Sequence, residues 1–175
     1  MRQALAAEPL IADAIGDHPA RPLLAPLARP HLGEHEAVGL DLILEGFLMH
    51  RGRPRVLAPA PRDRALLLGD YCYARGLVRV AAAGDLYAIS ALSELIATST
   101  GCVADDESAR GLAALWRATV GAIAGDLRAR EGLPAARLAI AAGDAAPVEA
   151  IGARLGIPAE LQAALGPAHE QESAA

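Results

Sequence analysis

The stretch "RALLLGDYCYARGLVRVAAAGDLYAIS", residues 64–90, decides the fold class. From Leu66 to Val80 it is apolar nearly all round, which predicts a helix buried on several sides. Asp63 is a suitable N-cap for this helix. Gly84 and Asp85 end it and begin the next helix. A long apolar helix of this kind indicates a helical core rather than a sheet.

Apolar residues recur at helical spacings on both sides of this stretch. We expect helices over residues 2–15, 22–27, 34–50, 66–80, 86–98, from the acidic run 104–108 to 125, and over 134–142, 147–155 and 158–165. No alternating strand of useful length and no internal repeat is found. The sequence therefore predicts an all-α helical bundle, with one domain over residues 1–168 and a disordered tail over 169–175.

Composition narrows the function classes. The chain has 175 residues, no lysine and a net charge of −5, which argues against nucleic acid as a partner. No window of 18 apolar residues is free of charge, so no membrane span is expected. A signal peptide is not recognised either, and Cys72 and Cys102 suit free buried thiols, so we expect a cytoplasmic protein. The arginines between Arg51 and Arg64 are interpreted as a solvated loop.

A metal site is the best case for an independent small enzyme. His31 and His35 are four residues apart, a spacing that lets two histidines share a metal ion on a helix. Pro30 and Gly33 indicate a helix start at this place instead. No third His or Cys follows at metal spacing, and no nucleophile elbow, P-loop or dinucleotide fingerprint occurs. The sequence therefore favours no metal bound by this chain.

Three segments follow one another in an informative order. They are "RPLL" at residues 21–24, "HRGRP" at residues 50–54 and "LLLGDYCYARG" at residues 66–76. Together they resemble the front half of a trans-prenyl diphosphate synthase, over about residues 20–125. This resemblance implies an all-α bundle around a deep cavity. It also implies the joining of isopentenyl diphosphate to an allylic diphosphate, with magnesium held by two DDxxD motifs.

The departures from that family concern the chemistry itself. Residues 47–50, "FLMH", run directly into "RGRP", where the family places its first aspartate-rich motif. The adjacent aspartates Asp105 and Asp106 lack the fifth-position aspartate of a second motif. Ionisation of an allylic diphosphate needs metal ions to neutralise the departing pyrophosphate, and carboxylates hold those ions. We therefore expect no prenyl transfer by this chain alone.

Some long-chain prenyl diphosphate synthases are heterodimers of a catalytic subunit and a short helical subunit without the aspartates. This chain resembles that small subunit in its length, helical class and missing motifs. The resemblance implies a full-length synthase as partner, with magnesium on that partner. It places Phe47, Leu48 and Met49 along the product tunnel, and it implies diphosphate contacts for Arg21, Arg51 and Arg53. The other interpretation of these residues is an ordinary core and a solvated loop.

Two further classes stay open at this point. One is a stand-alone homodimeric helical protein that binds an isoprenoid or another apolar ligand, and the other is a small enzyme of unrelated chemistry. An exposed apolar patch would favour an interface with a partner or with a second copy. Asp70 and Arg75 lie in the helix expected to be buried, so each is expected to have a partner.

Overall fold

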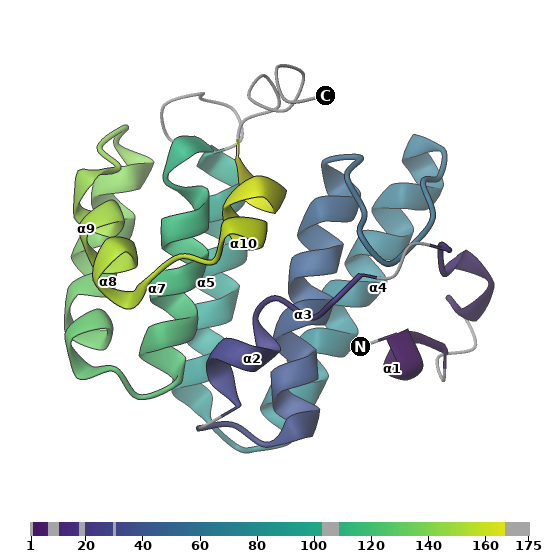
Figure 1. The fold of residues 1–175 in the computed structure, drawn as a ribbon, viewed down its shortest axis with the longest axis horizontal. Coiled ribbons are helices and arrows are strands. Elements are labelled where there is room, and N and C mark those ends of the chain that lie inside the picture. The colour runs from purple at the N-terminus through teal and green to yellow at the C-terminus, as the bar shows by residue number, and fades with distance from the viewer. Residues whose placement is uncertain (1, 7–10, 18–19, 30, 103–108, 167–175) are drawn as a thin grey trace. The chain divides into compact units, whose positions relative to one another are not determined.

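The computed structural model describes residues 2–6, 11–17, 20–29, 31–102 and 109–166. The regular elements among these residues are helical, which confirms the predicted all-α class. They are α1 (Arg2–Ala6), the 3-10 turn η1 (Ala12–Ala14), α2 (Ala25–Ala28), α3 (Glu34–His50), α4 (Arg62–Ala81), α5 (Leu86–Cys102), α7 (Leu112–Ile123), α8 (Leu127–Ala141), α9 (Ala146–Leu155) and α10 (Ala159–Leu165) (Figure 1).

Two compact units divide the chain, where the sequence predicted one domain. Unit 1 spans Met1–Leu86 and unit 2 spans Tyr87–Ala175. The expected tail over residues 169–175 lies outside the described residues, as do Asp105 and Asp106. Within the described part of the chain, no helix is long and apolar enough to cross a membrane.

The pair α3–α4 forms the centre of unit 1, and four glycines bring its two backbones together. A Cβ built on Gly39 would lie 2.8 Å from the Gly76 carbonyl oxygen, and one on Gly46 would lie 2.7 Å from the Gly69 carbonyl oxygen. Both α3 glycines and both α4 glycines are seven residues apart, which is two helical turns. Each glycine therefore recurs on the same face of its helix, and the two antiparallel helices meet at both levels.

Helix α3 has the predicted bounds but differs from α4 in how it is buried. Every residue of α3 from Ala37 to Met49 is buried. Helix α4, which was expected to be buried on several sides, buries one face only, with Ala65, Leu68, Gly69, Cys72, Gly76 and Val80. That expectation was wrong because the apolar residues of α4 go round the helix while unit 1 covers only the glycine-bearing side.

The start of the chain is not the single helix 2–15 that its apolar spacing predicted. Helix α1 ends at Ala6 and η1 follows at Ala12–Ala14. Ile15 then pairs with Leu57 in an isolated antiparallel bridge. The Gly16 N–H donates to the Val56 carbonyl oxygen at 2.8 Å. These backbone bonds to the loop after α3 replace the helical bonds that the pattern indicated.

Unit 2 is arranged around α7, in which every residue except Arg117 is buried. The Trp116 indole N–H donates to the Ser99 hydroxyl at 3.0 Å and so ties α7 to α5. The Arg117 guanidinium donates to the carbonyl oxygens of Leu155 and Gly156, both at 2.8 Å. These carbonyls end α9, so one cation holds the last turn of α9 against α7.

Helix α8 begins seven residues before Pro134, where the sequence analysis placed its start. Asp126, the N-cap of α8, accepts a hydrogen bond from the Ala129 N–H at 2.7 Å. The Arg154 guanidinium donates to both oxygens of the same carboxylate, at 2.7 and 3.0 Å. The prediction failed because this cap starts the helix upstream, and Pro134 is accommodated inside it.

Replacement of Asp126 by alanine is expected to lower the free energy of unfolding by about 1–2 kcal/mol. The bonds from Arg154 and the Ala129 N–H lower the pKa of Asp126 to about 2. The stabilisation is therefore complete above the ordinary carboxyl pKa and is lost as the pH falls toward 2. Urea denaturation of both proteins at neutral and acidic pH measures this. An equal difference at both pH values would contradict the role of the ionised cap.

Smaller differences concern helix ends. Helix α2 covers only Ala25–Ala28, and Asp63 lies in the first turn of α4, whose N-cap is Pro61. Helix α7 begins at Leu112, and α5 continues to Cys102. Cys72 and Cys102 are buried thiols that form no disulfide, as predicted.

Candidate functional site

Helix α3 carries two buried carboxylates one turn apart, and each one binds a different segment of backbone. Asp41 accepts hydrogen bonds from the N–H groups of Leu23, Leu24 and Ala25, at 2.7, 3.1 and 2.9 Å. The first two bonds reach Oδ1 and the third reaches Oδ2. The segment "RPLL" is therefore fixed against α3, and the carboxylate also satisfies free N–H groups at the start of α2.

Glu45 holds the segment that follows α3. Its Oε1 accepts from the N–H groups of Arg55, Val56 and Leu57, at 3.0, 2.8 and 2.9 Å. The Arg55 side chain then donates from Nη2 to the Arg21 carbonyl oxygen at 3.1 Å. Arg55 directly follows the segment at residues 50–54, so this bond ties the loop after that segment to the segment at residues 21–24.

Burial and hydrogen bonding act in opposite directions on these two carboxyl groups. Burial raises the pKa of Asp41 and of Glu45, whereas the three N–H donors at each group and the Arg55 charge lower it. Burial has the larger effect, so both pKa values lie above the ordinary ones. The ionised form is therefore less favourable in the folded protein than in the unfolded chain.

This direction predicts an effect of pH on stability. As the pH rises above about 4, the unfolded chain releases these two protons before the folded protein does, so the free energy of unfolding declines. The Glu45→Gln variant lacks one of the two titrations. We expect the stability of wild type relative to Glu45→Gln to be greatest near the ordinary carboxyl pKa and to decrease toward neutral pH. Urea denaturation across this range checks it, and an increase toward neutral pH would contradict it.

The arginines predicted to contact diphosphate occupy the C-terminal end of α3, the following loop and the "RPLL" segment. Arg51 lies over the Phe47 ring, with its guanidinium carbon 5.6 Å from the ring centroid. Burial lowers the pKa of Arg51 and of Arg53, and the Arg53 charge lowers the pKa of Arg51 further. Arg21 is exposed. Two partly buried guanidinium groups within electrostatic range of each other are suited to an anion.

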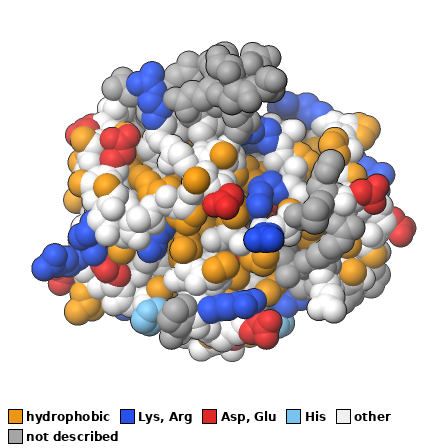
Figure 2. All heavy atoms as spheres, in the orientation of Figure 1, with side chains coloured by type: hydrophobic (Ala, Val, Ile, Leu, Met, Phe, Trp, Pro, Cys, Tyr) orange, Lys and Arg blue, Asp and Glu red, His pale blue; other side chains and the backbone are white. Residues whose placement is uncertain are grey.

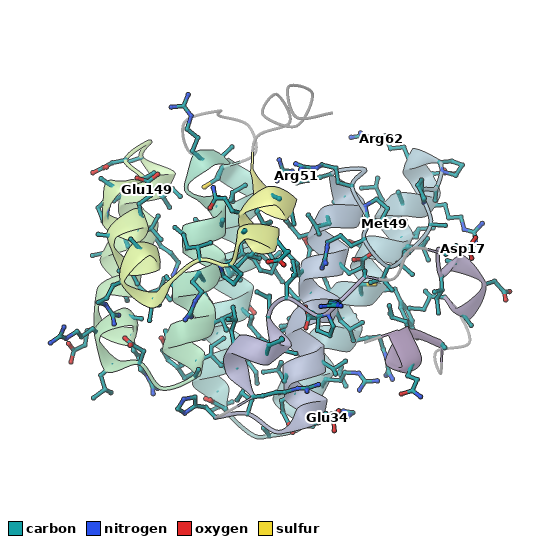
Figure 3. The ribbon with its side chains drawn as sticks, in the orientation of Figure 1. Asp17, Glu34, Met49, Arg51, Arg62 and Glu149 are labelled. Atoms are coloured by element: carbon teal, nitrogen blue, oxygen red, sulfur yellow. The ribbon has the colours of Figure 1, made fainter. Side chains whose placement is uncertain are left out.

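Phe47, Leu48 and Met49 are all buried, with exposed fractions of 3% or less. Met49 belongs to the core of unit 1, together with Leu68 and Cys72 of α4. Figure 3 labels Met49 and Arg51 near the C-terminal end of α3. Met49 is therefore a core residue of unit 1. The tunnel-wall role of the three residues stays a prediction.

The other predicted polar residues have ordinary surroundings. Asp70 lies 3.3 Å from the His50 Nε2 and its side chain is 70% exposed, so its helix position is not the buried one we expected. Arg75 is half-buried. His35 Nδ1 lies 3.0 Å from Arg79 Nη1. Among the residues that the structure describes, no three His, Cys, Asp or Glu side chains are grouped to hold a metal ion.

The sequence analysis missed the two features that fix this site. Asp41 and Glu45 are the acids inside an apolar run, and buried carboxylates require donors. An acidic residue within an apolar helix therefore predicts tertiary hydrogen bonds to its carboxylate. It does not predict which segments donate them.

Comparison with protein-family models, with curated proteins and with solved structures finds no match to this chain.

On the face drawn in Figure 2, the described arginines are interspersed with carboxylates and apolar side chains.

Proposed function

We propose that this chain is a non-catalytic, regulatory subunit of a heterodimeric trans-prenyl diphosphate synthase of the cytoplasm, with a truncated isoprenoid-synthase-like fold. Its partner is a full-length synthase subunit that carries both DDxxD motifs and the magnesium. The chain contributes to activity and product length through the interface and the tunnel wall. The proposal is supported by the resemblance over residues 20–125, in which the three segments follow in the family's order. It is also supported by helix α4, which contains the longest of these segments, residues 66–76.

The observation that carries this proposal is an exposed apolar face on α4. Leu67 is 72% exposed and Val78 is 59% exposed. With Ala74, also exposed, they lie at spacings of seven and four residues, on the side of α4 opposite the glycines that contact α3. Exposed apolar side chains that line up on one face of a helix are typical of an interface with another protein. The same helix carries the "GDY" and Arg75 of the resemblance.

The arginines and the apolar residues at the end of α3 have secondary roles in the proposal. Arg21, Arg51 and Arg53 hold an anionic group, the diphosphate of a substrate bound mainly by the partner. Phe47, Leu48 and Met49 belong to the wall that limits the product chain. The chain itself supplies no metal and no catalytic residue.

The Leu67→Glu variant is expected to lose the partner, because a charge on the α4 face must be desolvated in the complex. The matched control is Leu127→Glu, which places the same charge at a leucine of unit 2 that is 69% exposed. Leu127 is the first residue of α8, where an acidic side chain is favourable. Size-exclusion chromatography with light scattering of each protein, mixed with the full-length synthase of the same organism, measures complex formation.

We expect a heterodimer with wild type and with Leu127→Glu, and none with Leu67→Glu. Wild type that forms only a dimer with itself, and loses it in Leu67→Glu, would favour the stand-alone homodimeric binder. Equal complex formation by both variants would contradict the assignment of the α4 face.

A further inference from the structure

Unit 2 contains a groove between α5 and α8 with a volume of about 400 Å3. One face of each helix lines it, with residues at spacings of three and four. The lining residues are Glu94, Ala97, Thr98, Pro134, Arg137, Leu138 and Ala141. Short side chains leave the hollow, which lies in the lower part of the size range of small-molecule sites.

Arg137 is the unusual residue of this groove, because it is a buried cation with an unfilled hydrogen-bond donor. It is 7% exposed. Its Nη1 donates to the Glu94 carboxylate, while the Glu94 side chain is itself 58% exposed. The buried Nε–H has no acceptor among the described residues. Buried N–H groups are nearly always paired, so this unpaired donor, on a side chain that lines the groove, leaves Arg137 able to take a further acceptor.

This further acceptor can be identified by its chemistry. Nε and the adjacent Nη of a guanidinium form a fork that matches the two oxygens of a carboxylate. The rest of the lining is mainly apolar, so it suits a hydrocarbon group. A diphosphate brings more negative charge than one guanidinium neutralises, and Glu94 would repel it. We propose that this groove binds a small monocarboxylate with a hydrocarbon chain, its carboxylate on Arg137 and its chain along Ala97 and Ala141.

Glu94 acts as an internal competitor in this arrangement. The Nε–H is shielded from solvent, so a ligand carboxylate reaches it when the guanidinium turns toward the groove and releases Glu94. The Glu94 side chain is 58% exposed and also accepts from the Ser90 hydroxyl at 3.4 Å, so its released carboxylate remains solvated. Removing its charge therefore favours the ligand. The site is independent of the proposed synthase role, because every lining residue belongs to unit 2.

Isothermal titration calorimetry with octanoate tests this site, with 1-octanol as the neutral ligand of the same chain length. We expect wild type to bind octanoate at least about tenfold more tightly than octanol, because a bond to a charged group is lost in octanol. The Arg137→Met variant should lose about tenfold or more in octanoate affinity. The Glu94→Gln variant should bind octanoate more tightly than wild type. Equal affinity for octanoate and octanol, or weaker octanoate binding by Glu94→Gln, would overturn the proposal.

A second pair of variants keeps the test decisive if Arg137→Met unfolds. Ala97→Leu fills the groove and leaves Arg137 intact, whereas Ala135→Leu adds the same atoms at an exposed position of α8 outside the lining. Octanoate binding should be lost in Ala97→Leu and kept in Ala135→Leu, with the Tm of both near that of wild type. Binding kept in Ala97→Leu would overturn the proposal.

Discussion

The Gly76→Ala variant is expected to lower the free energy of unfolding by about 2–3 kcal/mol. Its added Cβ would lie 2.5 Å from the Ile43 side chain and 2.6 Å from the Gly39 carbonyl oxygen. The second contact is with backbone, so α3 and α4 must move apart to relieve it. At an open helical site the same substitution stabilises a protein by about 0.5–1 kcal/mol. A decrease in the free energy of unfolding would therefore indicate that α3 and α4 are in close contact at Gly76.

Gly101 of α5 is the matched control. It is helical and exposed, and a Cβ built on it meets nothing within 4 Å. Gly101→Ala should therefore be neutral or stabilising. Urea denaturation followed by circular dichroism compares the two variants with wild type. A stabilising Gly76→Ala would show that the backbones of α3 and α4 do not meet at this level.

The second large effect concerns the two buried carboxylates, and it should differ between them. Asp41 uses both oxygens, with Oδ2 accepting from the Ala25 N–H, so an amide at this position sets an N–H group against a donor. The Glu45 Oε1 accepts from all three N–H groups, and Oε2 accepts only a second, longer bond from the Arg55 N–H at 3.2 Å, so a glutamine keeps one acceptor for every donor. We expect Asp41→Asn to cost about 2–4 kcal/mol of stability and Glu45→Gln about 1 kcal/mol or less at neutral pH. Asp41→Ala and Glu45→Ala should each lower the free energy of unfolding by more than the corresponding amide variant, because they leave the three N–H groups without an acceptor.

The free energy of unfolding of all four variants, from urea denaturation, checks this order. Hydrogen exchange at the amides of Leu24 and Val56 adds a local readout. It should accelerate at Leu24 in Asp41→Ala and at Val56 in Glu45→Ala. Equal costs for Asp41→Asn and Glu45→Gln would contradict the assigned oxygens.

Periodicity alone predicted the all-α class and the bounds of α3, because α3 is long and strongly apolar. It failed where tertiary bonds replace local ones. Ile15 forms a bridge with Leu57 in place of the last turn of the predicted helix. Helix α8 starts at Asp126, whose carboxylate binds Arg154. Leu57 and Arg154 are both distant in sequence from the residues they bind, so a pattern of neighbouring residues does not predict these contacts.

The candidate site was predictable in part. The order of the segments in the chain singled out Arg21, Arg51 and Arg53 as candidates, and their role stays a prediction. The bonds from Asp41 to residues 23–25 and from Glu45 to residues 55–57 were not predicted. The seven-residue spacing of Gly39 and Gly46, and of Gly69 and Gly76, is a readable signal of close helix packing. It would also have shown which face of α4 is buried, and so which apolar residues face solvent.

A prenyl transfer assay tests the central claim most directly. Farnesyl diphosphate, isopentenyl diphosphate and magnesium are supplied to this chain, to the full-length synthase of the same organism, and to a mixture of the two. We expect no product from this chain alone, and from the mixture a product yield or chain length that differs from that of the synthase alone. Product from this chain alone, or a mixture identical to the synthase alone, would contradict the account.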